Sequence, residues 1–369
     1  MKTISELLDT LLLRKIPFAL YRLPGEVNPQ LLIQYSSFPQ RITSLENLPD
    51  RPGFLIAPFP VNGGEEAFLL QPDWMGTPEE VLALVGEEIA KYSLFMDSSE
   101  STAVHQSVSR EEYLHEVNQA VQAIHENALY KVIVSRKKVV PRPSSLNIPD
   151  FFTKLSETYP QAFVYFWQLP GVGSWMGATP EILMKETGGR IYTLSLAGTQ
   201  LYEEPDLEEY GWRAKEIAEQ AIVSRFIVQL LDKIGVEDME IVGPMTLRAG
   251  NLVHLATGFH FDSDNLRVSR SRFIQQLHPT PAVAGLPRDK ALEFIRTSEG
   301  YNRSYYSGLV GPVQLRGESH LYVNLRCMQL LNTELVLYSG AGITGSSNPE
   351  KEWQETENKM NTLLNVIES

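Results

Sequence analysis

The stretch SGAGITGSSNPEKEWQETENKM, from Ser339 to Met360, joins a glycine-rich segment to a charged helical pattern. Glycines that alternate with small residues predict a turn where the backbone approaches a ligand closely, because no Cβ atoms intervene. In the helix, Glu352, Glu355 and Lys359 share one face, since residues three and four apart are neighbours. Such a face can bind an anion and a hard cation together. An ordinary surface helix with salt-bridged charges is an equally good interpretation of this stretch alone.

The composition of the chain limits its class. With 369 residues, 43% of them hydrophobic, the chain can bury a large core in one domain or two. A net charge of −13 argues against a nucleic-acid partner. The lone cysteine, Cys327, excludes an internal disulfide and favours a reducing compartment. Acidic residues interrupt the first apolar segment, and no run approaches the roughly 20 apolar residues of a membrane span. We therefore expect a cytoplasmic protein without a membrane partner.

The first part of the chain, residues 1–109, predicts a helix, several short strands and a second helix from Pro78 to Tyr92. No residues in this part of the sequence have the spacing of a catalytic motif. The serine-rich segment 96–109 is either a linker or a surface loop. We accordingly divide the chain into an N-terminal region, 1–109, and a second region, 110–369, which holds the chemically informative patterns.

Two titratable residues stand at the edges of predicted strands. Lys131 begins the strand KVIVSRKKVV, where a lysine is usually solvated but can instead be a desolvated base with a lowered pKa. Glu181 follows the tight turn Gly177–Pro180 and precedes an apolar strand. It either faces solvent or is a proton donor with a raised pKa. The residues alone leave both alternatives open.

Further polar residues lie along the middle of the chain. Gly198 and Thr199 end a strand that follows a Gly188-Gly189 hairpin, and they suit backbone contact with a carboxylate. A helix is expected over 206–233, and its Glu219 is either solvated or turned inward. His254 lies between apolar residues and is expected either to be packed among them or to support a residue that contacts the ligand. No His/Cys cluster has zinc spacing.

Two patterns in the last third predict walls of a pocket. The loop LHPTPAVAGLPRDKA, Leu277 to Ala291, is stiffened by prolines and offers small apolar side chains to a planar ring. Arg326 lies within the apolar run HLYVNLRCMQLL, which predicts one strand. A buried arginine needs a partner, and a carboxylate is the natural one.

Six motifs occur in a fixed order, namely KVIVSR, GATPE, LAGT, HPTPAVAG, YVNLRC and GAGI followed by EW.ET..K. Together they resemble the chorismate-utilising enzymes (the family of anthranilate synthase component I) and, among these, the isochorismate synthases, over residues 110–367. The resemblance implies an α+β fold, with large, mostly antiparallel sheets in a two-layer core surrounded by helices. It also implies that residues 1–109 are integrated into the same fold, and that the active site lies in a cleft between the sheet layers.

The resemblance implies roles for particular residues. Lys131 would be the general base that activates water, and Glu181 the general acid that protonates the departing hydroxyl. Glu219 and Glu355 would bind Mg²⁺. The residues expected to contact chorismate are Gly198, Thr199, Ala282, Arg326, Gly340 and Lys359.

Three positions separate subfamilies. The ammonia-using relatives differ at Lys131, and Thr280 replaces the nucleophilic lysine of one of them. Salicylate synthases tend to carry threonine where this chain has Ala282. The resemblance therefore favours an isomerase that stops at isochorismate. Gln220 stands where the family often has histidine, which affects the tuning of the metal site.

Three functional hypotheses follow. The leading one is a Mg²⁺-dependent isochorismate synthase, which serves menaquinone or siderophore biosynthesis. The second is a salicylate synthase, and the third is a chorismate-binding protein without turnover. For the first we expect a monomer that has no glutamine amidotransferase subunit.

Overall fold

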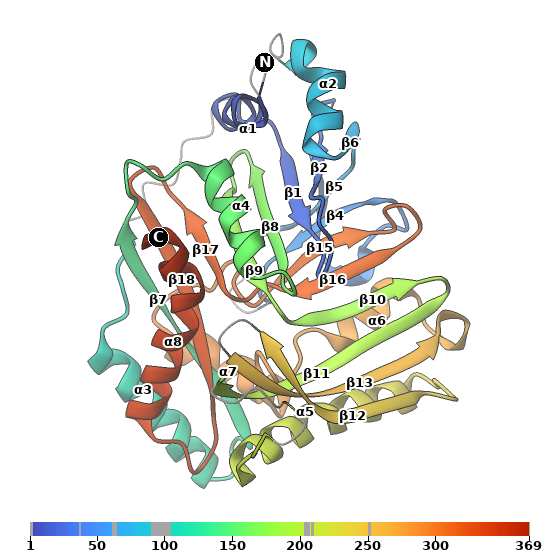
Figure 1. The fold of residues 1–369 in the computed structure, drawn as a ribbon. Helices are drawn as coiled ribbons and strands as arrows, with labels where there is room; N and C mark the ends of the chain where they lie inside the picture. The colour runs from blue at the N-terminus through green and yellow to red at the C-terminus, as the bar shows by residue number, and fades with distance from the viewer. Residues whose placement is uncertain are drawn as a thin grey trace.

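The computed structural model describes residues 3–36, 38–60, 65–89, 105–202, 207, 210–249 and 252–368. Two large antiparallel sheets, here called sheet A and sheet B, form its centre (Figure 1). In spatial order, sheet A contains β14 (Gly285–Leu286), β7 (Lys131–Pro141), β18 (Glu334–Ile343), β17 (Cys327–Leu330), β9 (Gly173–Thr179), β8 (Phe163–Leu169), β1 (Phe18–Arg22), β2 (Gln30–Ile33) and β6 (Trp74–Gly76).

Sheet B contains β12 (Glu240–Ala249), β13 (Leu252–Asp262), β11 (Arg190–Leu201), β10 (Ile182–Thr187), β16 (Ser319–Val323), β15 (Leu309–Val313), β4 (Gly53–Ala57), β5 (Ala67–Leu70) and β3 (Gln40–Ile42). The α-helices of the described residues are α1 (Ile4–Leu13), α2 (Pro78–Ile89), α3 (Arg110–His125), α4 (Ile148–Thr158), α5 (Ala214–Lys233), α6 (Arg270–Leu277), α7 (Arg288–Ser298) and α8 (Pro349–Glu368), with short 3₁₀ turns at Leu45–Asn47 and Ser263–Asn265. The α+β class and the arrangement of antiparallel sheets with surrounding helices are as predicted.

The core has separate layers because the strands of sheet A are buried on both faces. On β8, Phe163, Tyr165 and Trp167 join an aromatic cluster between the two sheets, and Phe163 stacks on Tyr322 of sheet B at 4.2 Å. Val164 and Phe166 point the opposite way, since successive strand residues alternate between faces. They pack with α1, α2, α4 and α8 on the outer face of sheet A.

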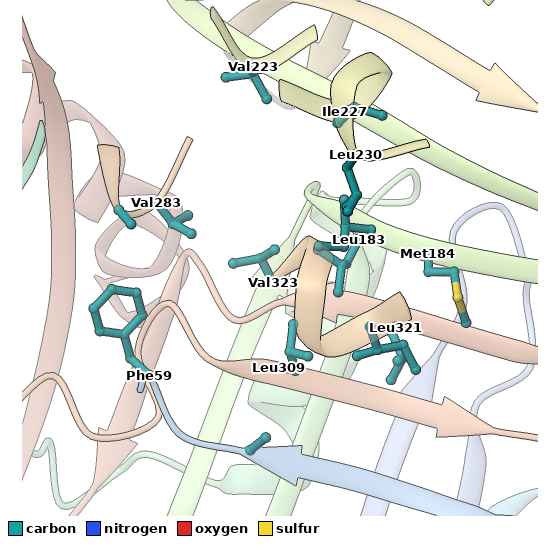
Figure 2. Close-up of a cluster of buried hydrophobic side chains, with 14 of the residues drawn as sticks. Phe59, Leu183, Met184, Val223, Ile227, Leu230, Val283, Leu309, Leu321 and Val323 are labelled. Carbon is teal, nitrogen blue, oxygen red and sulfur yellow. The ribbon is translucent and has the colours of Figure 1, made fainter. Parts of the chain in front are cut away.

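A third cluster joins α5 to one face of sheet B. Figure 2 shows Ile227 and Leu230 of α5 above Leu183 of β10, with Val283 and Phe59 to one side. The apolar half of α5 is therefore fixed against the sheet, and the orientation of its polar residues follows from that packing.

The N-terminal region contributes strands to both sheets. Strands β1, β2 and β6 belong to sheet A, and β3, β4 and β5 belong to sheet B. Of the segment 96–109, residues 96–104 lie outside the described part of the structure; residues 105–109 lead into α3, whose first turn is capped by Ser109. Among the described residues, no helix combines the length and apolarity needed to cross a bilayer.

The structure corrects three boundaries. The run HLYVNLRCMQLL forms two strands in different sheets, β16 in B and β17 in A, and Arg326 lies in the crossover at φ +48°. Of the expected helix 206–233, residues 210–213 are not helical, and α5 begins at Ala214, where the side chain of Glu216 accepts a hydrogen bond from the Arg213 amide at 3.0 Å; residues 206, 208 and 209 lie outside the described part of the structure. Gly340 and Gly342 of the opening stretch lie in strand β18, and the turn before α8, which holds Gly345, falls at 344–348.

Candidate active site

A cavity of about 740 Å³, counting its open mouth, lies where β7 and β18 of sheet A face β11 and β13 of sheet B. Helices α5 and α8 close its sides. Nine of the ten residues singled out from the sequence line it: Lys131, Glu181, Gly198, Glu219, Ala282, Arg326, Gly340, Glu355 and Lys359. The tenth, Thr199, lies on β11 opposite His254, and its side chain is outside the described part of the structure.

Lys131 is the first residue of β7, yet its side chain is 2% exposed. The two-residue strand β14 pairs with the start of β7 and covers it, with Leu286 opposite Lys131. On the neighbouring strand β18, Gly342 leaves room for the Lys131 side chain, because a Cβ at position 342 would stand 3.0 Å from Lys131 Cε. Burial lowers the pKa of Lys131, against the opposing effect of the Glu219 carboxylate. The solvated alternative is therefore wrong for this lysine, and a neutral amine is favoured.

Glu181 lies between β9 and β10 and is 5% exposed. Thr179 Oγ1 accepts a hydrogen bond from the Glu181 amide at 3.2 Å, and the Glu181 carbonyl accepts one from the Val323 amide at 2.9 Å. Burial raises the pKa of Glu181 to about 8, although Lys131, Lys359 and Arg326 act in the opposite direction. The side chain is thus protonated near neutral pH and can donate a proton.

The buried faces of α5 and α8 each direct a carboxylate into the cavity. Glu219 is 8% exposed, and its Oε1 accepts no hydrogen bond from the described residues; Lys215 Nζ lies 3.8 Å away. Glu355 pairs with Lys359 at 2.6 Å, and Lys359 also donates to the Gly340 carbonyl at 2.9 Å. Burial by itself would raise the pKa of Glu355, but Lys359, together with Lys215 and Arg326, outweighs burial and lowers that pKa. The ionised form of the Glu355 carboxylate, which offers oxygen donors, is therefore favoured.

These two carboxylates fit a hard divalent cation. Among the described residues no cluster of three or more His, Cys, Asp or Glu side chains is arranged to hold a metal. Mg²⁺, however, is commonly bound by one or two carboxylates, with waters and substrate oxygens as its other ligands. A buried carboxylate oxygen without a hydrogen bond, as at Glu219, is the kind of group that such an ion satisfies.

Other residues that line the cavity suit an anionic, planar ligand. Arg326 is partly buried, donates to Thr362 Oγ1 at 2.9 Å, and burial lowers its pKa to about 10. Gly198 has φ +74°, and a Cβ there would stand 2.8 Å from Glu216 Cβ, so the position requires glycine. Ala282 and Val283 of the proline-rich loop form an apolar wall, as predicted from the sequence.

Several lining residues were not identified from the sequence. Tyr306, Ser307 and Tyr338 reach the cavity from segments without a recognisable spacing. Lys215, which pairs with lining and neighbouring carboxylates rather than lining the cavity itself, was also missed; it lies one helical turn before Glu219 and pairs with the buried Glu352 at 2.6 Å. His254 lines the cavity, with Nδ1 3.2 Å from the Gly198 carbonyl oxygen, and burial lowers its pKa to about 3. The histidine is therefore neutral.

Comparison with known proteins places these features in a family. Residues 78–368 match the sequence profile of a family described as "Chorismate binding enzyme". The chain is similar to the vibriobactin-specific isochorismate synthase of Vibrio cholerae, with 28% identity over 70% of this chain and 67% of the relative. It is also similar to the isochorismate synthase EntC of Escherichia coli, with 29% identity over 64% of this chain and 62% of the relative.

A solved structure shares the fold over the whole chain. MenF, the menaquinone-specific isochorismate synthase of Escherichia coli, superposes with a TM-score of 0.77 at 22% identity, covering 100% of this chain and 91% of MenF. The sequence alignments are shorter, spanning about two thirds of the Vibrio relative and less than two thirds of EntC.

Proposed function

This chain belongs to the chorismate binding enzyme family, and on that premise we propose that it is an isochorismate synthase that uses Lys131 as base and Glu181 as acid. One observation carries the assignment of roles. A lysine with a lowered pKa and a carboxylic acid with a raised pKa line the same cavity. Environments that shift the pKa values of two groups in this way identify an acid–base pair.

Positioning of chorismate is the first task of the site. The substrate carries two carboxylates, and the cavity offers cationic side chains, Arg326 and Lys359, together with the backbone around Gly198 and Gly340. Because these groups come from both sheets and from α8, a bound ring is held from several directions. Ala282 has no hydroxyl group to orient the pyruvyl side chain of the substrate, which favours release of isochorismate over elimination of that side chain.

The reaction then needs one proton removed and one supplied. Neutral Lys131 accepts a proton from water as the water oxygen forms a bond to ring carbon C2. The two ring double bonds shift by one position each, and the bond between C4 and its hydroxyl oxygen breaks. Glu181 donates its proton to that oxygen, which leaves as water. Atoms and charge balance, and general acid and general base catalysis contribute about 10²–10⁴-fold each.

We propose Glu219 and Glu355 as the residues that would hold Mg²⁺. When bound, the ion would neutralise the ring carboxylate of the substrate beside these acidic side chains. Lys215 and Lys359 already pair with carboxylates of the same region, at 2.6 Å from Glu352 and Glu355 respectively. The protein therefore limits the repulsion among the acidic groups on its own.

The test is product analysis after incubation with chorismate and Mg²⁺, by chromatography. Isochorismate as the main product supports the proposal. Salicylate and pyruvate as main products would transfer the assignment to a salicylate synthase. Binding of chorismate in a calorimeter, without conversion over hours, would instead indicate a non-catalytic binding protein.

The remaining expectations stay predictions. Residues 1–109 and 110–369 are proposed to form one folding unit, since the first region supplies strands to both sheets. A cytoplasmic monomer without an ammonia-supplying subunit is proposed from the sequence. The relatives named above include vibriobactin-specific and menaquinone-specific enzymes, so both siderophore and menaquinone biosynthesis stay open as the use of the product.

A further inference from the structure

The motif KVIVSR ends in a residue that the mechanism does not use. Arg136 is 1% exposed and lies on β7, on the face that carries Val132 and Val134. Lys131 and Ile133 occupy the other face and line the cavity. A fully buried guanidinium is costly unless each of its donors is used. Its partners therefore indicate why an arginine stands at this position.

Within the described part of the chain, the side-chain hydrogen-bond partners of Arg136 come from a single turn of helix α8. Its Nε donates to Thr356 Oγ1 at 2.6 Å, and its Nη2 donates to the Glu357 carboxylate. The guanidinium carbon lies 3.7 Å from the ring centroid of Trp353, so the planar group also stacks on this turn. Tyr113 of α3 supports the same tryptophan edge to face at 5.7 Å.

That turn contains Glu355, and the next turn contains Lys359. Arg136 thus holds helix residues on both sides of Glu355, whose carboxylate lines the cavity. Figure 1 shows α8 lying along β18 and β7, with α3 beside it. Helix α8 is also attached to β18 by the bond from Lys359 to the Gly340 carbonyl, next to Ser339, which is the β18 partner of Arg136.

We propose that Arg136 is a positioning residue, which fixes the metal-binding and substrate-binding face of α8 relative to the strand that carries the base. This inference rests on the proposed function for the roles of Lys131, Glu355 and Lys359. Strand β7 holds Lys131 at its start and Arg136 five residues later, about 16 Å along the strand. One rigid strand therefore sets the distance between the base and the helix.

The planar fork of arginine is what this position uses. A lysine in its place keeps the charge but has a single point of contact, and it does not stack flat on Trp353. Arg136→Lys should therefore leave the core packed and loosen α8 selectively. Arg110 provides a matched control, since it also pairs with α8, at Glu350, but both side chains of that pair are more than half exposed. Exposed pairs of this kind contribute little.

The first measurement needs no substrate or metal. Amide hydrogen exchange should be faster by about tenfold or more in residues 353–360 of Arg136→Lys, and unchanged in α4 and in Arg110→Met. The second is steady-state kinetics with chorismate and Mg²⁺. We expect KM and the Mg²⁺ concentration for half-maximal rate to rise about tenfold.

The outcomes separate the alternatives. Unchanged exchange in α8, or lowered thermal stability with unchanged KM and Mg²⁺ requirement, would overturn the inference and leave Arg136 as an ordinary core residue. If Arg136→Lys does not fold, Thr356→Val removes one acceptor and carries the same test. A wild-type protein that converts no chorismate would refute the proposed function, whereas the exchange experiment would still decide whether Arg136 holds the helix.

Discussion

Replacing Gly342 by alanine should impair turnover much more than folding. The glycine lies in β18 beside the base, with a backbone conformation that alanine also adopts. An alanine Cβ would stand 3.0 Å from Lys131 Cε, 3.4 Å from its Nζ and 3.6 Å from Glu219 Oε1. The added methyl group therefore contacts the proposed base directly and lies next to a proposed metal ligand.

The size of the effect follows from these distances. Carbon atoms pack best at about 3.5–4.0 Å, so the end of Lys131 must move by about 0.5–1 Å. A displacement of about 1 Å in a catalytic group costs up to about 10²-fold in rate, and we expect kcat to fall about 10–100-fold. Crowding costs about 1–3 kcal/mol, and the gain of about 0.4–1 kcal/mol from a stiffer unfolded chain partly offsets it.

The measurement is kcat for chorismate turnover, with urea unfolding of the same samples. Gly345→Ala is the matched control, because its Cβ would make only ordinary contacts, at 3.5 Å, with Ile124 and His125. We expect near wild-type kcat for the control. If Gly342→Ala matched the control in kcat while remaining folded, the placement of Lys131 as base would be refuted.

The other predictions concern the acid, the base and the metal. Lys131→Ala should lose about 10²–10⁴-fold in kcat with chorismate affinity within about tenfold of wild type; near-normal turnover would remove Lys131 from the base role. Because the pKa of Glu181 is raised to about 8, the acid form is lost above that pH, and the rate should fall along an alkaline limb that Glu181→Gln lacks; an identical limb in both proteins would assign it to another group. The folded state keeps a proton that the unfolded chain loses between about pH 4.5 and 8, so wild-type stability should decrease across this window by up to about 1.4 kcal/mol per pH unit, and urea unfolding of Glu181→Gln should show a smaller decrease. Glu219→Gln and Glu355→Gln should raise the Mg²⁺ concentration needed for half-maximal rate, compared with the exposed control Glu350→Gln; unchanged titrations would make both carboxylates structural.

The sequence was enough to predict those site residues whose side-chain type alone suits them to acid, base or metal-binding roles. Lys131, Glu181 and Glu219 were each compatible with a solvated side chain, and the order of motifs favoured the functional alternative. What the sequence did not show was the cause of their burial. Lys131 is covered by β14, a strand of two residues that lies more than 150 positions later in the chain, and such a long-range pairing leaves no periodic signal.

The fold was predictable at the level of class and strand content, but not of sheet assignment. The run through YVNLRC is continuously apolar, so its periodicity predicts one strand. The chain changes sheets there because the side-chain Nδ2 of Asn324 donates to the Tyr305 carbonyl at 2.8 Å, and because Arg326 adopts a left-handed conformation. Both causes depend on tertiary contacts, and the change of sheet is what places Arg326 at the cavity.

The central claim is that Lys131 activates a water molecule for attack on the ring while the original hydroxyl leaves. Turnover of chorismate in oxygen-18 water, followed by mass spectrometry of the product, tests this most directly. We predict isochorismate that carries one solvent oxygen. Isochorismate without label would show that the hydroxyl migrates within the substrate, and would contradict the roles given to both Lys131 and Glu181.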